Sequence, residues 1–152
     1  MDNNVILRRL RYNFDFSDAQ MISLFAAAKK TVTRAEVSNW LKKEQDSDFE
    51  EINDETLASF LNGFITDRRG QREGPQRPVE TKLNNNIIFR KLKIALNLKD
   101  GDVLEILNAV DLPISKHELS AFFRKPEQRQ YRECKDQILR NFLHGLQLKH
   151  RK

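Results

Sequence analysis

The chain opens with Asn3-Asn4-Val5-Ile6-Leu7-Arg8-Arg9-Leu10, and the same pattern returns as Asn85-Asn86-Ile87-Ile88-Phe89-Arg90-Lys91-Leu92. The correspondence continues without a gap, so that residues 3–65 align with residues 85–147 at a constant offset of 82. Roughly one aligned residue in four is identical, and most of the others keep their polarity. The chain is therefore a duplicated unit, and one structure must explain both copies.

Size and composition limit the classes of protein to which the chain can belong. The 152 residues provide for one medium domain or two small ones. No apolar run approaches the roughly 20 residues that a membrane helix needs, and Met1-Asp2-Asn3-Asn4 lacks the basic start and apolar stretch of a signal peptide. Cys134 is the only cysteine, which excludes an internal disulfide. These features predict a cytoplasmic protein that does not associate with a membrane.

The net charge of +5 is unevenly spread along the chain. Residues 3–65 contain 8 Lys and Arg against 10 Asp and Glu, whereas residues 85–152 contain 14 against 8. A basic half attracts polyanions such as nucleic acids. The alternative interpretation is that the charge only keeps a small protein in solution.

Hydrophobic periodicity predicts about four short helices in each copy and gives no sustained strand pattern. The third helix has the clearest start, because Thr33-Arg34-Ala35-Glu36 and Ser115-Lys116-His117-Glu118 are capping boxes at matching positions. Ser17-Asp18-Ala19-Gln20 is a further capping box, and acidic residues favour a fourth helix that begins near Asp54 and Asp136. The fourth helix of copy one has the spacing of a buried face at Leu57, Phe60, Leu61 and Phe64.

The two copies are separated by residues that interrupt a helix. Gly74, Pro75 and Pro78 are typical of a connecting segment. We therefore predict an all-α fold of two tandem homologous repeats, residues 1–70 and 84–152, each with about four short helices. Residues 71–83 are predicted to form the linker.

Finer expectations concern single residues. Asn3 or Asn4 is expected to cap the first helix, and Asp100 to cap the second helix of copy two. Gly63 and Gly145 lie within apolar helical patterns, where Gly costs about 1 kcal/mol relative to Ala. A Gly repeated in this way indicates either a close approach of helices, across the junction of the repeats, or the end of a helix.

Several motifs, taken jointly, resemble those of the YehS-like family of small bacterial proteins, which is classed as a domain of unknown function. The motifs are the doubled Asn-Asn starts, Phe60-Leu61-Asn62-Gly63 with Arg68-Arg69-Gly70, Asn84-Asn85-Asn86-Ile87 with Lys91-Leu92-Lys93, and Tyr131-Arg132-Glu133-Cys134 with Phe142-Leu143. The resemblance covers nearly the whole chain. It implies a cytoplasmic helical protein of two repeats, and it brings no catalytic residues with it.

The short turns between the second and third helices, over residues 29–32 and 111–114, predict a helix-turn-helix-like pair in each repeat. In a helix-turn-helix the second helix enters the major groove of DNA. Small polar residues followed by cations on its outward face suit base edges flanked by phosphates. The alternative is a solvated face, because a helix C-terminus favours Lys and Arg in any case. The residues of these two faces are Ser38, Asn39, Lys42, Lys43, His117, Ser120, Arg124 and Lys125.

The first helix of each repeat carries a second duplicated set of polar residues, which predicts a paired anion or partner site. The structural alternative is an ion pair or helix-cap contact with repeated acids, namely Glu51 and Asp54 or Glu133 and Asp136. The set consists of Asn4, Arg8, Arg11, Asn86, Arg90 and Lys93.

The sequence offers no signature of an enzyme. His117, His144 and His150 have no evident Cys or carboxylate partner at ligand spacing. Cys134 aligns with Ile52, which favours a small core residue over a nucleophile. We therefore predict a non-enzymatic protein that uses no metal or cofactor. Its predicted partner is duplex DNA, and the alternative is a protein–protein interaction adaptor that uses the duplicated helical surface.

Overall fold

The computed structural model of the chain describes residues 1–71 and 74–151, and every regular element in that part is an α-helix. Each repeat contributes four helices at matching positions, so the predicted all-α fold of two tandem repeats is confirmed. Arg72 and Glu73 of the predicted linker lie outside the described residues. In chain order the helices are α1 (Asn3–Phe14), α2 (Asp18–Ala27), α3 (Arg34–Leu41), α4 (Asp54–Arg69), α5 (Asn85–Ala95), α6 (Asp100–Asn108), α7 (Lys116–Phe122) and α8 (Asp136–His150).

The predicted capping boxes open α2, α3 and α7. In the box of α3, Thr33 N donates to Glu36 Oε1 at 2.9 Å, and Glu36 N donates to Thr33 Oγ1 at 3.1 Å. Each box satisfies backbone donors that the first helical turn leaves free.

Two of the predicted caps are wrong. Asp2, rather than Asn3 or Asn4, caps α1 and accepts from Val5 N at 2.9 Å. Lys99 is the cap of α6, because it has the extended conformation and its N donates to Asp102 Oδ2 at 2.8 Å, while Asp100 is the first residue of the helix and binds Lys93 Nζ at 2.6 Å.

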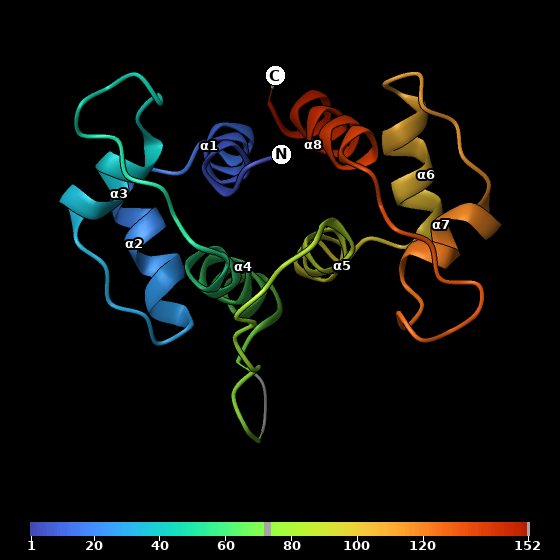
Figure 1. The fold of residues 1–152 in the computed structure, drawn as a ribbon, viewed down its shortest axis with the longest axis horizontal. Coiled ribbons are helices and arrows are strands. Elements are labelled where there is room, and N and C mark those ends of the chain that lie inside the picture. Colours follow the sequence, from blue (N-terminus) through green and yellow to red (C-terminus); the bar gives the residue numbers. More distant parts are fainter. Residues whose placement is uncertain (72–73, 152) are drawn as a thin grey trace.

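Four helices stand side by side in the centre of the molecule, seen end-on in Figure 1. The helices α1 and α5 occupy opposite corners of this bundle, as do α4 and α8, while the pairs α2–α3 and α6–α7 flank it on opposite sides. The helix α1 packs on α8, and α4 packs on α5, so both of these contacts join one repeat to the other. The repeats are thus related by an approximate two-fold rotation about the viewing axis of Figure 1.

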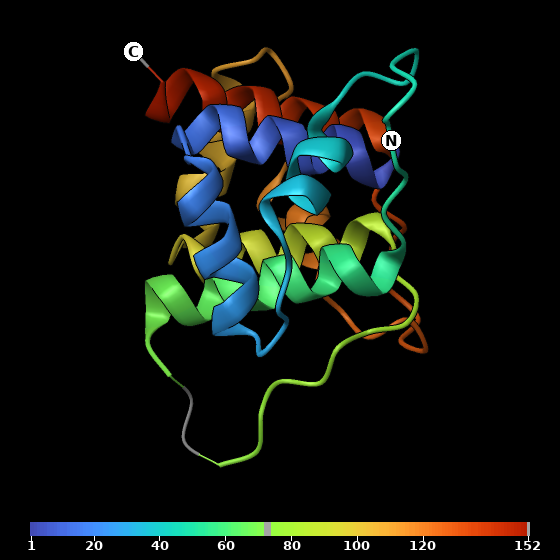
Figure 2. The same ribbon diagram turned by 90° about the vertical axis from the view of Figure 1, so that its left-hand side faces the viewer.

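The four central helices all run in the same direction, as Figure 2 shows. At the starts of α1 and α8, the ammonium group of Met1 binds Asp136 Oδ2 at 2.8 Å. At their ends, Arg151 Nη1 donates to Tyr12 O at 2.8 Å. The start of α5 is tied to that of α4 in the same way, because Leu83 N donates to Asp54 Oδ2 at 2.8 Å. One end of the bundle therefore holds four helix N-termini, and the other end holds four C-termini.

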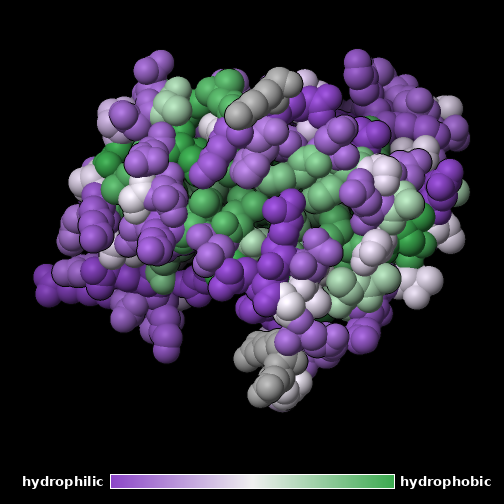
Figure 3. Space-filling model, turned by 180° about the vertical axis from the view of Figure 1, so that it is seen from behind, coloured by the Kyte–Doolittle hydropathy of each residue, from purple (hydrophilic) through white to green (hydrophobic). Residues whose placement is uncertain are grey.

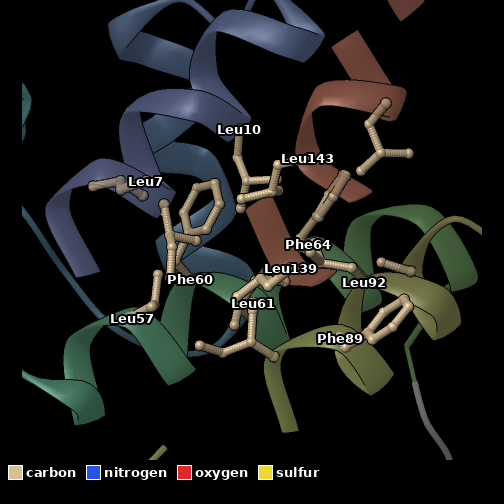
Figure 4. Close-up of a cluster of buried hydrophobic side chains, with 14 of the residues drawn as sticks. Leu7, Leu10, Leu57, Phe60, Leu61, Phe64, Phe89, Leu92, Leu139 and Leu143 are labelled. Atoms are coloured by element: carbon tan, nitrogen blue, oxygen red, sulfur yellow. The ribbon is translucent and has the colours of Figure 1, made fainter. Parts of the chain in front are cut away.

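One hydrophobic core runs through both repeats. Figure 4 shows side chains of α1, α4, α5 and α8 converging in the middle of the bundle. The predicted buried face of α4 is confirmed, since Leu57, Phe60, Leu61 and Phe64 are all buried. In the part of the chain that the structure describes, we find no helix that is both long and apolar enough to span a bilayer.

The repeated glycines allow neighbouring helices of the same repeat to touch. A Cβ atom on Gly63 would lie 1.7 Å from Leu24 O in α2, and a Cβ atom on Gly145 would lie 2.4 Å from Ile106 Cγ2 in α6. The close approach predicted from the sequence is thus confirmed. It joins α4 to α2 and α8 to α6 within each repeat, however, so the expected place across the junction is wrong. Both glycines are also inside their helices, so neither ends one.

A buried asparagine near the start of α1 and of α5 holds the loop that precedes α4 or α8. Asn4 Nδ2 donates to Trp40 O at 3.0 Å and to Glu50 O at 2.8 Å, and Asn4 Oδ1 accepts from Ile52 N at 3.0 Å. Asn86 makes the same three bonds at the matching positions, to Phe122 O, Arg132 O and Cys134 N. Both asparagines are buried, at 3% and 6% exposure.

An aspartate at the start of α4 and of α8 joins the two repeats. Asp54 accepts from Asn3 Nδ2 of its own repeat at 2.8 Å as well as from Leu83 N. Asp136 accepts from Asn85 Nδ2 at 2.7 Å as well as from the Met1 ammonium group. The hydrogen bond from Asn3, and then that from Leu83, lower the pKa of the Asp54 carboxyl below its ordinary value.

We predict that Gly63→Ala and Gly145→Ala both destabilise the fold. Each should cost about 3 kcal/mol or more, because the added methyl group would meet a backbone carbonyl oxygen, that of Leu24 at 1.7 Å from Gly63 and that of Ile106 at 2.7 Å from Gly145. The matched control is Gly101→Ala in α6, where nothing lies within 4 Å, and it should stabilise by up to about 1 kcal/mol. Urea denaturation measures all three. Equal stabilities of the three variants would contradict the packing role.

We predict that Asn4→Ala lowers the free energy of unfolding by about 3 kcal/mol or more, because it leaves buried backbone groups without partners. The control is Asn141→Ala, since Asn141 only accepts from Gln137 on the surface of α8. This control should change stability by less than about 1 kcal/mol. Chemical denaturation gives both values. A loss at Asn4 no larger than that at Asn141 would show that water replaces the side chain.

We predict that the destabilisation caused by Asp54→Asn is larger at pH 7 than at pH 3. A carboxyl with a lowered pKa in the folded state adds stability above its unfolded pKa of about 3.9. That stability is lost as the pH falls through the folded value. Urea denaturation at both pH values tests this, with Asp67→Asn in the exposed last turn of α4 as the control. If Asp54→Asn costs the same at both values, the folded carboxyl has an ordinary pKa.

Candidate nucleic-acid interface

The helix-turn-helix-like pairs are present, but their second helices are shorter than expected. The helix α3 ends at Leu41 and α7 ends at Phe122, so Lys42, Lys43, Arg124 and Lys125 lie beyond these helices rather than on them. The prediction that they end the outward helical faces is therefore wrong. The physical reason lies in α1 and α5, whose arginines take up the carbonyl groups with which the helices end.

Much of the remaining predicted face is engaged within the protein. Asn39 Oδ1 accepts from Lys42 Nζ at 3.0 Å, and Asn39 Nδ2 donates to Glu50 at 3.4 Å. Ser38 and Ser120 are half-buried, whereas His117 is exposed.

The starts of α3 and α7 also bear negative charge. A helix-turn-helix protein directs the N-terminal residues of its second helix towards DNA. In this chain the Glu36 and Glu118 carboxylates lie at that point, where each binds back to its cap. Hydrogen bonds from Ser115, first from its backbone and then from its side chain, lower the pKa of Glu118. A charged carboxylate there repels phosphate.

The second predicted set combines structural residues with exposed cations. Asn4 and Asn86 hold the loops described above. Arg8 donates to Lys42 O at 2.8 Å, and Arg90 donates to Phe123 O. These two carbonyl groups belong to the C-caps of α3 and α7. A cation there offsets the negative end of the helix dipole.

The two remaining residues of that set differ in their surroundings. Lys93 binds Asp100, while Arg11 is exposed at the end of α1. Within the described residues, neither is paired with the acids that the sequence suggested. Asp54 and Asp136 bind Asn3 and Asn85 instead.

The parallel bundle brings together cations that the sequence analysis did not group. The last turns of its helices are basic, while the first turns of α4 and α8 carry the acids Asp54, Glu55 and Asp136. The repeated basic pairs Arg68-Arg69 and His150-Arg151 were a signal that could have been used. Desolvation lowers the pKa of His150, so this side chain is not counted among the cations. The cations at the C-terminal end are Arg11, Arg68, Arg69, Lys93, Lys149 and Arg151.

We call the C-terminal end of the bundle the basic end. Figure 3 looks onto it and shows hydrophobic residues in the middle, surrounded and crossed by hydrophilic ones. Half-buried Phe14 and Leu96 contribute to its apolar part. The guanidinium group of Arg68 lies 5.4 Å from the ring centre of Phe14, and that of Arg151 lies 4.0 Å from the ring centre of Tyr12. The aromatic rings thus hold two of the cations in place.

Two adjoining grooves open at the basic end between α4 and α5. The first has a volume of about 400 Å³ and the second about 260 Å³, and they share Arg69 and Ile94. The second groove adds Arg77 to the lining. Among residues 1–71 and 74–151, no ion pair involves Arg11, Arg69 or Arg90. These cations are therefore open to an external anion.

The single cysteine belongs to the core. Cys134 is buried, and desolvation raises the pKa of its thiol to about 12. A thiol that stays protonated at neutral pH is a poor nucleophile, so the prediction of a core residue is confirmed. In the described part of the chain, no three His, Cys, Asp or Glu residues gather as a metal site would require.

Comparison with known proteins assigns the chain to a family. The model of the family described as "Protein of unknown function (DUF1456)" matches residues 3–70 and again residues 85–152. The chain is 39% identical over 147 residues to the "Uncharacterized protein YehS" of Escherichia coli (strain K12), which covers 96% of this chain and 94% of that protein. No solved structure matches it. The chain belongs to the DUF1456 family and contains two copies of the unit that defines it.

Proposed function

We propose that this protein binds nucleic acid, and that the basic end of the bundle makes the main contact. The observation that carries the proposal is the parallel direction of α1, α4, α5 and α8, which gathers their basic last turns on one face. Arg11 and Arg69 on that face form no ion pair with the described residues. A surface with several open cations releases counterions from a nucleic acid on binding.

The charge distribution of the whole molecule also favours binding with the basic end towards the nucleic acid. The acids of the first helical turns lie at the opposite end, where Asp54 and Asp136 are bound to backbone or terminal nitrogen. A protein with cations at one end and acids at the other is turned by the field of a polyanion before contact. The guanidinium groups also suit phosphate, because their planar donors match its oxygens.

The outward faces of α3 and α7 are weaker candidates for the same function. Lys42 Nζ donates to Asn39 Oδ1 and lies 3.6 Å from Asp48 Oδ2, so its charge already has partners within the protein. Lys43 and Lys125 remain exposed next to these helices. These two lysines provide a direct comparison with the basic end.

A protein–protein adaptor is the second candidate function. Hydrophobic residues in the middle of the basic end, among them half-buried Phe14, Leu96 and Leu98, favour it. An acidic partner segment with an apolar face would fit both features. Binding of such a partner depends less on salt than phosphate binding does, because burial of apolar area contributes to it.

We predict that Arg11→Ala combined with Arg69→Ala weakens binding to a mixed-sequence DNA duplex. The slope of log affinity against log salt should become shallower by about two units, because two phosphate contacts are lost. Fluorescence anisotropy at several salt concentrations measures the slope. The matched control is Lys43→Ala combined with Lys125→Ala, which also removes two exposed cations and should leave the slope unchanged.

The possible outcomes separate the candidate functions. If the change at Lys43 and Lys125 alters the slope and the change at Arg11 and Arg69 does not, the DNA contact lies near α3 and α7 instead. Absence of binding by the unaltered protein to duplex DNA at low salt would reject nucleic-acid binding and leave the adaptor. Circular dichroism of each variant confirms that the helices are retained.

A further inference from the structure

The larger of the two grooves between α4 and α5 has the character of an anion site. It lies between the end of α4 and the last turn of α5, and its volume is about 400 Å³. Its cations are Arg69, Arg90 and Lys93, and Asn97 also lines it. Ile94, Leu98 and Phe123 complete the lining.

Two of the three cations in the groove are held in place by the protein. Arg90 donates to Phe123 O, which leaves other guanidinium N–H groups free. Lys93 binds Asp100 at 2.6 Å, and its Nζ lies 4.6 Å from the ring centre of Phe123. A ligand that enters the groove therefore meets side chains that are already ordered, which lowers the entropy cost of binding.

The matching place at the end of α1 and α8 shows what the groove lacks. Arg69 corresponds to Arg151, which is separated from it by the offset of 82. Arg151 lies over the ring of Tyr12 and pairs with Asp15 Oδ1 at 3.4 Å. At the α1–α8 contact, Asp15 of copy one thus supplies a carboxylate to the Arg151 guanidinium group of copy two.

Copy two has different residues at the positions of Tyr12 and Asp15, the two residues that Arg151 contacts. Asn97 stands where copy one has Asp15, and Ile94 stands where copy one has Tyr12. Asn97 and Asp15 share the same backbone conformation, with φ values of 52° and 54°. The backbone conformation of the position is therefore preserved while its negative charge is lost.

The charge at the two places differs accordingly. The groove beside α5 combines Arg69, Arg90 and Lys93 with one acid, Asp100, which binds Lys93, and these four residues have a net charge of +2. The matching residues at the α1–α8 contact are three cations and two acids, with a net charge of +1. They are Arg8, Arg11, Arg151, Asp15 and Asp18.

We propose that the groove binds a phosphate group, whose oxygens take the place that the Asp15 carboxylate has in copy one. Arg69 and Arg90 donate to the phosphate oxygens, and Lys93 adds positive charge. A phosphate of the nucleic-acid backbone is the ligand if the function proposed above is right. A free phosphate or phosphomonoester offers the same chemistry.

The test restores in copy two the residue that copy one has. Asn97→Asp places a carboxylate beside Arg69 in a backbone conformation that Asp15 already adopts, so the variant should fold. The control is Gln137→Glu at the opposite end of the bundle. Copy one has Glu55 at that position, and an acid suits the first turn of a helix. Each variant therefore adds one negative charge, and each introduces the residue that copy one has at the matching position.

Two measurements are made on the full chain. Anisotropy with a mixed-sequence duplex should show that Asn97→Asp weakens binding about fivefold to tenfold near 0.1 M salt, with a slope shallower by about one unit. Thermal unfolding in sodium phosphate, compared with sodium chloride at equal ionic strength, should show a stabilisation by phosphate that Asn97→Asp loses. Gln137→Glu should behave like the unaltered protein in both.

The outcomes distinguish this site from the proposed function. If Asn97→Asp weakens duplex binding and also loses the stabilisation by phosphate, the ligand is a phosphate of the nucleic acid. If the unaltered protein does not bind the duplex but phosphate stabilises it in a way that depends on Asn97, the site stands with a free phosphate or phosphomonoester, and nucleic-acid binding falls. If Asn97→Asp behaves like Gln137→Glu in both measurements, the inference is overturned even where the duplex binds.

Discussion

The common direction of the four central helices is the constraint on which the rest of the structure depends. Parallel helix dipoles side by side repel one another, so this arrangement requires charges of the right sign at both ends. Asp54 and Asp136 provide them at the N-terminal end, where each joins its own repeat to the start of the other. Basic last turns provide them at the C-terminal end. The same compensation that stabilises the bundle therefore gives the molecule a basic face.

The sequence was informative wherever a feature depends on residues a few positions apart. The repeats, the capping boxes at Thr33 and Ser115 and the buried face of α4 are all of this kind, and the structure confirms them. Gly63 could be recognised as a close approach for the same reason, because it interrupts an apolar helical pattern. Its partner Leu24 could not be named, since that contact joins two helices far apart along the chain.

Features that depend on distant contacts could not be predicted. Nothing in the periodicity states that α1 packs on α8 of the other repeat, so the basic end was not visible as a surface. The polar residues of α1 illustrate the same limit. Their repetition is as compatible with a ligand site as with the contacts that Asn4 and Arg8 make to backbone carbonyl groups. The shortened α3 follows from the second of these contacts, which a local pattern does not contain.

The two contacts between the repeats have diverged since the duplication. At the α4–α5 contact, buried Lys91 binds Asn62 at 2.6 Å and pairs with Glu80 of the linker at 3.0 Å. Desolvation lowers the pKa of Lys91 and the bond to Glu80 opposes that change, so the linker is part of this contact. The α1–α8 contact has Arg9 and His144 at the matching positions and ends in the Arg151–Asp15 pair. Both contacts end in a groove of about 400 Å³, but the one at the end of α1 and α8 contains the Asp15 carboxylate, while the one beside α5 has the uncharged Asn97 at the matching position.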